Sequence, residues 1–117
     1  MNIQRQKNTK EKGVIEFLVY KEENKYIGVC LTFDIVEEGK NPTELMNSIK
    51  EAAHLHLDTV IREKLSDQLL NRYAPEEYWK KYFAAAKEIE KPVQSVNNTS
   101  LIRSPYHRSP LLSVQFA

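Results

Sequence analysis

The chain has little of several residue types that mark common protein classes. It holds one cysteine, one tryptophan and three glycines among 117 residues. A single cysteine cannot form an internal disulfide, which argues against the disulfide-stabilised scaffolds of small secreted proteins. No hydrophobic run is long enough for a transmembrane helix, and the polar N-terminal stretch lacks the apolar core of a signal peptide. We therefore expect a cytoplasmic protein that does not enter a membrane.

A strong net charge is also missing. The 17 Lys and Arg side chains nearly balance the 16 Asp and Glu side chains, so no overall field draws the chain to nucleic acid or to a membrane surface. The length fits one domain, and a chain of this size buries about two thirds of its unfolded surface. That burial is sufficient for one modest core.

Apolar patterning begins after a polar, basic N-terminus. We expect residues 1–12 to be mobile because they are charged and hold few apolar side chains. Residues 14–21 are rich in β-branched and aromatic side chains and predict a strand, and a second strand over 26–33 follows a polar break. That second run alternates large apolar residues with small or semi-polar ones, as in a sheet with one well-covered face. A third, shorter strand is expected over 34–38.

The clearest local signal starts a helix. Asn41 can cap free backbone N–H groups, Pro42 suits the first helical position, and Glu44 lies where a capping box has a carboxylate. The helix is expected over 42–62, and residues at helical spacing form an apolar stripe that should pack on the sheet: Met46, Ile49, Ala53, Leu57 and Val60. Residues 13–65 are thus predicted to form a β-β-β-α domain.

A second helix is predicted within residues 66–92. It begins at Pro75, carries acidic residues in its first turn and lysines in its last, and ends near Lys91 before a proline. Its spacing indicates a core or interface role for four aromatic residues: Tyr78, Trp79, Tyr82 and Phe83. Because a sheet with one helix is marginal as a monomer, we expect this helix to pack across a neighbouring subunit.

The remaining residues, 93–117, are polar and punctuated by prolines. The sequence RSPYHRSP at 103–110 mixes Arg, Tyr and His side chains that could contact single-stranded RNA by charge and stacking. An irregular extension, or an arm that packs on a partner subunit, is the favoured interpretation. Residues 111–116 could add one strand. The predicted class is α+β: a small antiparallel sheet of three to four strands, one helix on a face, a second helix and a C-terminal arm.

Few residues point to catalysis or metal binding. Asp34, Glu37 and Glu38 are the acidic group on the predicted sheet, and a two-metal nuclease would need such carboxylates to converge. Charges at a sheet edge that oppose aggregation are the simpler interpretation. His54 and His56 lie two residues apart on a helix and point to different sides, so they cannot bind one metal together. The sequence predicts no catalytic residue, no metal site and no cofactor.

The segment from Tyr26 to Asp58 resembles the HicB-like domains, a small bacterial family. The pattern is a strand, a glycine turn and a capped helix rich in Ala and Leu, and the matching residues are Val29 to Asp34, Gly39, Thr43 to Leu45, Ile49, Glu51 to Ala53 and Leu57. With the first strand, the resemblance spans roughly residues 14–62, which is under half of the chain.

The resemblance implies a partial RNase H-like fold, in which a helix covers one face of a small antiparallel sheet. It also implies a homodimer or homotetramer that neutralises a small ribonuclease toxin of the HicA family by covering its surface. Many family members carry a C-terminal DNA-binding module, but the chain from Asp67 onward departs from that pattern. The second helix has balanced charge, whereas phosphate contacts favour a net basic recognition helix. DNA binding is therefore in doubt.

The leading prediction is a protein-interaction module of antitoxin type that masks a HicA-like ribonuclease by occlusion. Occlusion needs surface complementarity and no catalytic residues. Acidic groups on the sheet rim could meet a basic ribonuclease, so the partner-binding candidates are Asp34, Glu37 and Glu38. The oligomer-interface candidates are Tyr78, Trp79, Tyr82 and Phe83. The alternative is an oligomeric HicB-like scaffold, or a nucleic-acid-associated regulator, without a toxin partner.

Overall fold

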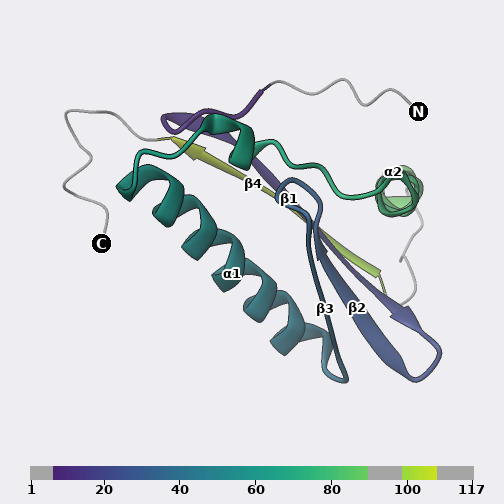
Figure 1. Cartoon of the computed structure of the whole chain (residues 1–117). Helices are drawn as coiled ribbons and strands as arrows, with labels where there is room; N and C mark the ends of the chain where they lie inside the picture. Colours follow the sequence, from purple (N-terminus) through teal and green to yellow (C-terminus); the bar gives the residue numbers. More distant parts are fainter. Residues whose placement is uncertain (1–6, 90–98, 108–117) are drawn as a thin grey trace.

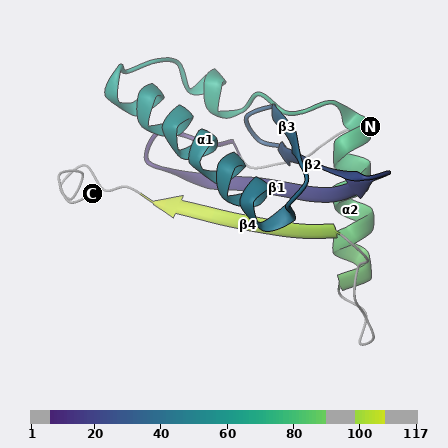
Figure 2. The same ribbon diagram turned by 90° about the horizontal axis from the view of Figure 1, so that it is seen from below.

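The computed structural model describes residues 7–89 and 99–107. Its elements follow one another as β1 (Lys12–Glu22), β2 (Lys25–Cys30), β3 (Ile35–Gly39), α1 (Pro42–Arg62), the short 3-10 helix η1 (Asp67–Leu70), α2 (Glu76–Ile89) and β4 (Thr99–His107). The strands form one antiparallel sheet in the order β3-β2-β1-β4. α1 lies across one face of this sheet and α2 crosses one end of the other face (Figure 1, Figure 2). The predicted α+β class is confirmed.

β1 is the central strand and is buried on both of its faces. Successive side chains of a strand point to opposite faces, so Phe17 packs in the core under α1 and Leu18 in the core under α2. Both side chains have no exposed surface. Residues 15–19 are buried without a break. For Phe17, Leu18 and Val19 this follows from the double cover, because a strand with one wet face would alternate with polar residues.

α1 begins and ends where its local signals predict. The Asn41 side chain accepts a hydrogen bond of 2.9 Å from the backbone N–H of Glu44, and Pro42 occupies the first helical position. The apolar stripe is buried against the sheet as expected, with Ile49 and Ala53 fully enclosed. This helix therefore owes its boundaries to its own sequence and its burial to the sheet.

The sheet is covered on both faces, which corrects the expectation of one covered face. The large apolar side chains of Ile27 and Val29 pack under α2, whereas Gly28 and Cys30 face α1. The alternation in the sequence predicts that the small residues line the less covered side of the sheet. They instead allow α1 to approach the strand closely, because a methyl group on Gly28 would lie 2.9 Å from Leu45 Cγ.

α2 packs on the sheet of its own chain. Trp79 is fully buried, and its ring meets those of Tyr73 and Tyr82 edge to face at centroid distances of 5.8 Å. The expectation that this helix packs across a neighbouring subunit is thus wrong for Trp79 and Tyr82, since both are already buried inside the chain. The predicted end of the helix near Lys91 lies outside the described residues.

The first described residues are part of the fold. Asn8 is only 5% exposed, and its side-chain amide donates to the carbonyls of Val14 at 3.1 Å and Leu70 at 3.0 Å. Its Oδ1 accepts from the Val14 N–H at 3.0 Å. Nearby, Lys10 Nζ lies 2.6 Å from Asp67 Oδ1. The predicted mobile terminus over 1–12 is therefore wrong at these positions, because β1 is longer than β2 and its uncovered edge needs hydrogen-bond partners.

β4 replaces the irregular extension that was expected around RSPYHRSP. Its residues 99–107 pair with β1 from Tyr20 to Lys12. Pro105 lies opposite Val14, whose N–H and C=O bond to Asn8 on the far side of β1. Because the two residues of such a pair both direct their backbone groups away from each other, the nitrogen of Pro105 points to the outer edge of β4. Its missing N–H group therefore costs no hydrogen bond within the sheet. The strand suggested for 111–116 lies outside the described residues.

No helix in the described part of the chain has both the length and the apolar character to cross a membrane.

Burial of Cys30 predicts a thiol that does not react in the folded protein. Burial raises the pKa of this thiol to about 12, and the thiolate is the reactive form. At about pH 8, near the usual thiol pKa of about 8.5, a thiol-specific chromogenic reagent should label the native protein very slowly and the denatured protein at once. The chain has no other cysteine, so the absorbance reports Cys30 alone. Rapid labelling of the folded protein would contradict the buried position.

The Asn8 contacts predict a specific loss of stability. Asn8→Ala leaves the Val14 N–H and the Val14 and Leu70 carbonyls without their partner. The free energy of unfolding in urea should fall by about 1–3 kcal/mol. Asn47→Ala, at an exposed position of α1, is the matched control and should change it by less than about 0.5 kcal/mol. Equal stability of the two variants would refute the role of Asn8.

Candidate functional site

The acidic residues predicted for the sheet rim occupy three different settings. Asp34 is exposed in the turn before β3, with a positive φ of 59°. Glu37 and Glu38 follow on β3, an edge strand, and therefore point to opposite faces of the sheet. The three carboxylates do not converge on one point, so the structure does not build the metal-binding group that nuclease chemistry would require.

Glu37 belongs to the face that α1 covers. Its Oε1 accepts a hydrogen bond of 2.7 Å from the Ser48 hydroxyl on α1. Glu38 lies on the opposite face and accepts a bond of 3.2 Å from Lys25 Nζ, in a pair whose side chains are 63% and 38% exposed. Such an exposed pair contributes little to stability. The structure thus joins Glu37 to the outer surface of α1 and separates it from Glu38.

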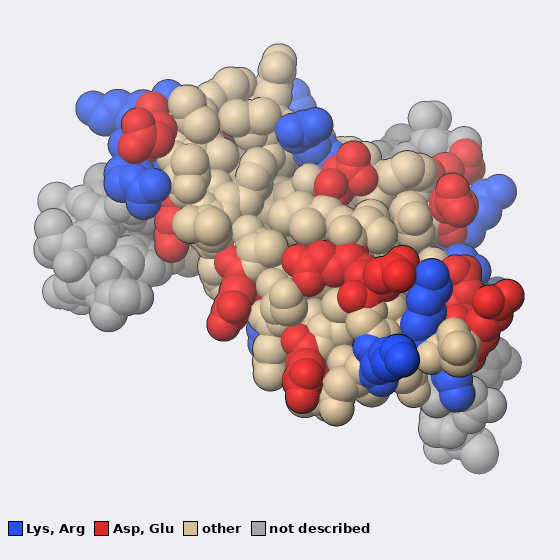
Figure 3. All heavy atoms as spheres, turned by 60° about the horizontal axis from the view of Figure 1, so that its bottom comes forward, with Lys and Arg blue, Asp and Glu red and all other residues tan. Residues whose placement is uncertain are grey.

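The outer surface of α1 carries a row of acidic residues. Glu44, Glu51 and Asp58 are seven residues apart in sequence, so they lie in one line along the helix, opposite its buried stripe. Leu55 lies in the same line and is 64% exposed. We call Glu37, Glu44, Glu51, Asp58 and Leu55 the acidic ridge. Acidic side chains gather on this side of the molecule (Figure 3).

The carboxylates that α1 contributes to the acidic ridge form no ion pair with another described residue. Across residues 7–89 and 99–107, no Lys or Arg side chain forms an ion pair with Glu44, Glu51 or Asp58. The apolar stripe of α1 predicts its buried side, and the seven-residue spacing of the acidic residues is not among the predictions made from the sequence. That spacing was a readable signal, whereas the addition of Glu37 from β3 depends on how α1 lies across the sheet.

The aromatic candidates divide into buried and half-buried residues. Trp79 and Tyr82 belong to the core under α2, while Tyr78 and Phe83 pack at its border and keep part of their surface. Phe83 contacts the Trp79 ring at 5.7 Å between centroids. An interface on this helix would therefore use Tyr78 and Phe83, and that role stays a prediction.

The two histidines of α1 have separate surroundings. His56 Nε2 lies 2.6 Å from the Leu69 carbonyl oxygen, and its ring packs on Phe33 with centroids 4.7 Å apart. His54 is exposed. Among the residues whose placement is described, no three His, Cys, Asp or Glu side chains are grouped so that they could hold a metal ion. The contacts of His56 attach η1 to α1 and explain its partial burial.

The close approach of α1 to β2 predicts that Gly28 positions the acidic ridge. A methyl group there would lie 2.9 Å from Leu45 Cγ and 3.0 Å from Ile49 Cγ1, both on α1. Gly28→Ala should therefore push the helix outward and lower the free energy of unfolding by about 1–3 kcal/mol. Gly39→Ala is the matched control, because its methyl group would meet Leu45 Cδ1 at an ordinary 3.8 Å. Urea unfolding distinguishes the two, and a larger loss in Gly39→Ala would contradict this role.

No family model, curated protein or solved structure matches the chain. The resemblance of residues 14–62 to HicB-like domains therefore stays a prediction. The acidic ridge, the edge of β3 and the observed fold are the features on which a function can be proposed.

Proposed function

We propose that this chain is a protein-interaction module of HicB-like, antitoxin type, which masks a small basic ribonuclease of HicA type by occlusion in the cytoplasm. The acidic ridge is the observation that carries the proposal. Masking requires a surface that complements the partner and excludes water from it, and it requires no reacting group on the masking protein.

The composition of the ridge suits a basic partner. Leu55 is an exposed apolar side chain with Glu51 and Asp58 as its neighbours on the helix surface. An apolar contact ringed by polar groups is the usual anatomy of a protein interface. Arg62 lies one turn beyond Asp58 but pairs with Glu63, and the ridge carboxylates of α1 form no ion pair within the described residues. Such carboxylates suit a positive partner, because complementary charge speeds association and disfavours wrong partners. A basic ribonuclease surface meets both requirements.

The edge of β3 supports a second contact of the same partner. The backbone N–H and C=O groups of Glu16 point toward the β2 side of β1. In antiparallel strands these groups point to alternate sides from one residue to the next. When this alternation is followed through the registers of β1 with β2 and of β2 with β3, the N–H and C=O groups of Val36 and Glu38 lie at the open edge. Val36 is 46% exposed. An extended segment of the partner could add to such an edge, beside Asp34 and Glu37.

Purification of the tagged full-length chain from its native host, at moderate salt, tests the proposal. Mass spectrometry should identify a small basic protein in stoichiometric amount that is toxic when expressed alone. Recovery of the chain only with copies of itself would favour the alternative, an oligomeric HicB-like scaffold without a toxin. In that case the half-buried Tyr78 and Phe83 become the first residues to replace.

Removing the charges of the ridge should weaken the complex. In the variant E44Q/E51Q/D58N, we expect the dissociation constant for the purified partner to rise on the order of 10-fold and the salt dependence of association to flatten. All three positions are exposed, so the free energy of unfolding should change by less than about 1 kcal/mol.

The control for this experiment is E22Q/E23Q, which removes exposed acidic charge at the β1–β2 turn. Titration calorimetry at two salt concentrations should give the wild-type affinity for the control. If the ridge variant also binds with wild-type affinity and salt dependence, the ridge is not the contact surface.

A further inference from the structure

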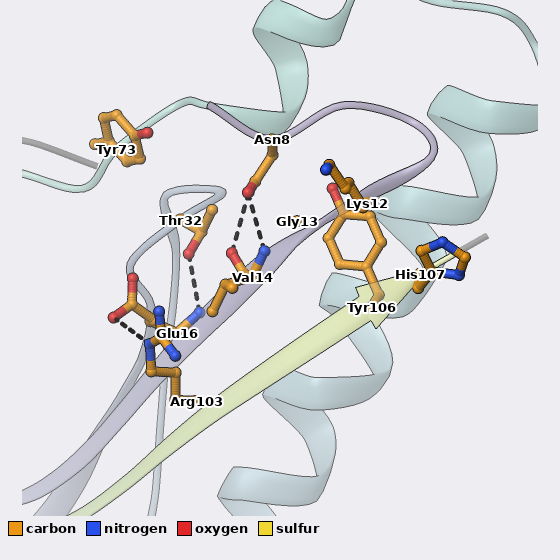
Figure 4. A pocket seen from close by; sticks show the side chains of 10 residues that line it. All are labelled: Asn8, Lys12, Gly13, Val14, Glu16, Thr32, Tyr73, Arg103, Tyr106 and His107. Atoms are coloured by element: carbon orange, nitrogen blue, oxygen red, sulfur yellow. Dashed lines mark hydrogen bonds and ion pairs between the residues drawn. The ribbon is translucent and has the colours of Figure 1, made fainter. Parts of the chain in front are cut away.

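The sheet ends in two edge strands, β3 and β4, which differ in their capacity to accept a further strand. In β4, the nitrogen of Pro105 points to the outer edge and has no hydrogen to donate. Arg103, on the same strand, lies with its Nε 3.8 Å from Oε2 of the buried Glu16 carboxylate (Figure 4). Proline and charge on an edge strand discourage the addition of another strand. The β4 edge is therefore poorly suited to pairing.

The β3 edge keeps its hydrogen-bonding groups. β3 has no proline, and the N–H and C=O groups of Val36 and Glu38 point away from β2. Both residues are exposed, and they lie about 7 Å apart along the strand. In residues 7–89 and 99–107, no strand pairs with this side of β3. An extended chain therefore finds donors and acceptors here at the spacing that it needs.

The charges of β3 oppose pairing with the same edge of a second copy. The outward groups of the two strands must meet, so an antiparallel pair would be centred on Val36, Glu37 or Glu38. Centring on Glu37 or on Glu38 places two identical carboxylates opposite each other. Centring on Val36 places Asp34 opposite Glu38. Like charges directly opposite each other are destabilising, so this edge suits a strand of opposite charge.

Apolar and acidic side chains follow one another along this edge. Ile35 packs against the core under α1, and Val36 is 46% exposed on the opposite face. Asp34 precedes this apolar pair, and Glu37 and Glu38 follow it. A complementary strand thus needs two apolar residues with basic residues on both sides of them.

The carboxylates on either side of the apolar pair are available to a partner. In the described part of the chain, neither Asp34 nor Glu37 forms an ion pair, and the Ser48 hydroxyl that donates to Glu37 is neutral. Glu38 lies 3.2 Å from Lys25 Nζ, in an exposed pair that contributes little. A basic strand therefore gains from all three carboxylates.

We propose that the basic partner binds this edge through an extended segment, which adds to the sheet antiparallel to β3. Antiparallel pairing continues the pattern of the sheet and is the more stable arrangement per residue. The first two residues of the segment are basic and lie opposite Glu38 and Glu37. The next two are apolar and lie opposite Val36 and Ile35, and a basic residue near Asp34 follows. Backbone hydrogen bonds provide affinity, and this order of side chains provides specificity.

Strand addition at β3 rests on the proposed function, because it names the element by which the masked protein would bind. A complex held by the acidic ridge alone would leave the backbone groups of Val36 and Glu38 in water. Exchange of their amide hydrogens with deuterium therefore distinguishes strand addition from side-chain contact. The amide of Glu37 is an internal reference, since its backbone groups point to β2.

A synthetic peptide tests strand addition before any partner is identified. Thr-Lys-Lys-Val-Val-Lys-Thr has the inferred order of side chains, and the control peptide has glutamate at each lysine position. Titration of the full-length protein should show about 10-fold tighter binding of the lysine peptide. Binding should slow amide exchange at Val36 and Glu38 and leave Glu37 unchanged. Equal affinity for the two peptides, or binding without this protection, would overturn the proposal.

Methylation of single peptide nitrogens separates backbone pairing from charge. The first valine donates its N–H to the Val36 carbonyl in the inferred register, so the form methylated there should bind about 10-fold more weakly. The second lysine lies opposite Glu37 and directs its N–H away from β3, so the form methylated there should bind like the parent. If both forms bind alike, the peptide does not pair with β3 as a strand.

Val36→Pro tests the same hydrogen bonds from the side of the protein. The N–H of Val36 points outward, so its loss leaves the pairing of β3 with β2 intact and should weaken peptide binding about 10-fold. Val36→Thr keeps the N–H and the branched shape, and it is the matched control. Wild-type affinity in folded V36P would contradict strand addition. If V36P does not fold, the methylated peptides decide.

Strand addition and masking fail separately. Peptide binding with protection of Val36 and Glu38, but no basic ribonuclease purified with the chain, supports strand addition and refutes masking. A purified ribonuclease that binds without protecting these two amides supports masking and refutes strand addition. Protection that appears when the free protein is concentrated would identify a second copy as the occupant of the edge and overturn the assignment to a basic partner.

Discussion

The double burial of β1 is the constraint on which the rest of the structure depends. Phe17 and Leu18 are neighbours in sequence, point to opposite faces and are both fully buried, so the sheet needs an apolar layer on each side. α1 supplies one layer along its full length. α2 supplies the other only at one end, with Trp79 at its centre. The uncovered remainder of that face borders a cavity of about 420 Å³, whose lining includes Glu16, Arg103 and Tyr73.

The unequal lengths of the strands create a second requirement. β1 has 11 residues and β2 has 6, so the start of β1 has an edge with no strand beside it. Buried backbone groups need hydrogen-bond partners. The Asn8 amide, the Thr32 hydroxyl and the Leu31 N–H supply them. Two of these residues, Asn8 and Thr32, also line the cavity, so the cavity is a consequence of how the sheet ends.

The near-neutral charge of the chain hides two surfaces of opposite sign. Acidic residues follow the outer line of α1 with Glu37 beside them, whereas Lys12, Arg103 and His107 gather at the far end of the opposite sheet face. Charges separated by more than about 10 Å are screened from each other at moderate salt. Each surface can therefore attract its own partner, and a net charge of +1 says nothing about either.

Local signals in the sequence specify several elements: the β1–β2 hairpin, the boundaries of α1 with its Asn41 cap, and the acidic line whose seven-residue spacing puts Glu44 and Glu51 together. Contacts made only in the folded chain explain which face each helix covers, why Trp79 is buried within its own chain, and why residues 99–107 form a strand. Those outcomes depend on contacts between distant residues, such as the bond of Asn8 to Leu70, 62 positions away. Local propensity carries no information about such partners, because their free energy exists only after the chain has folded.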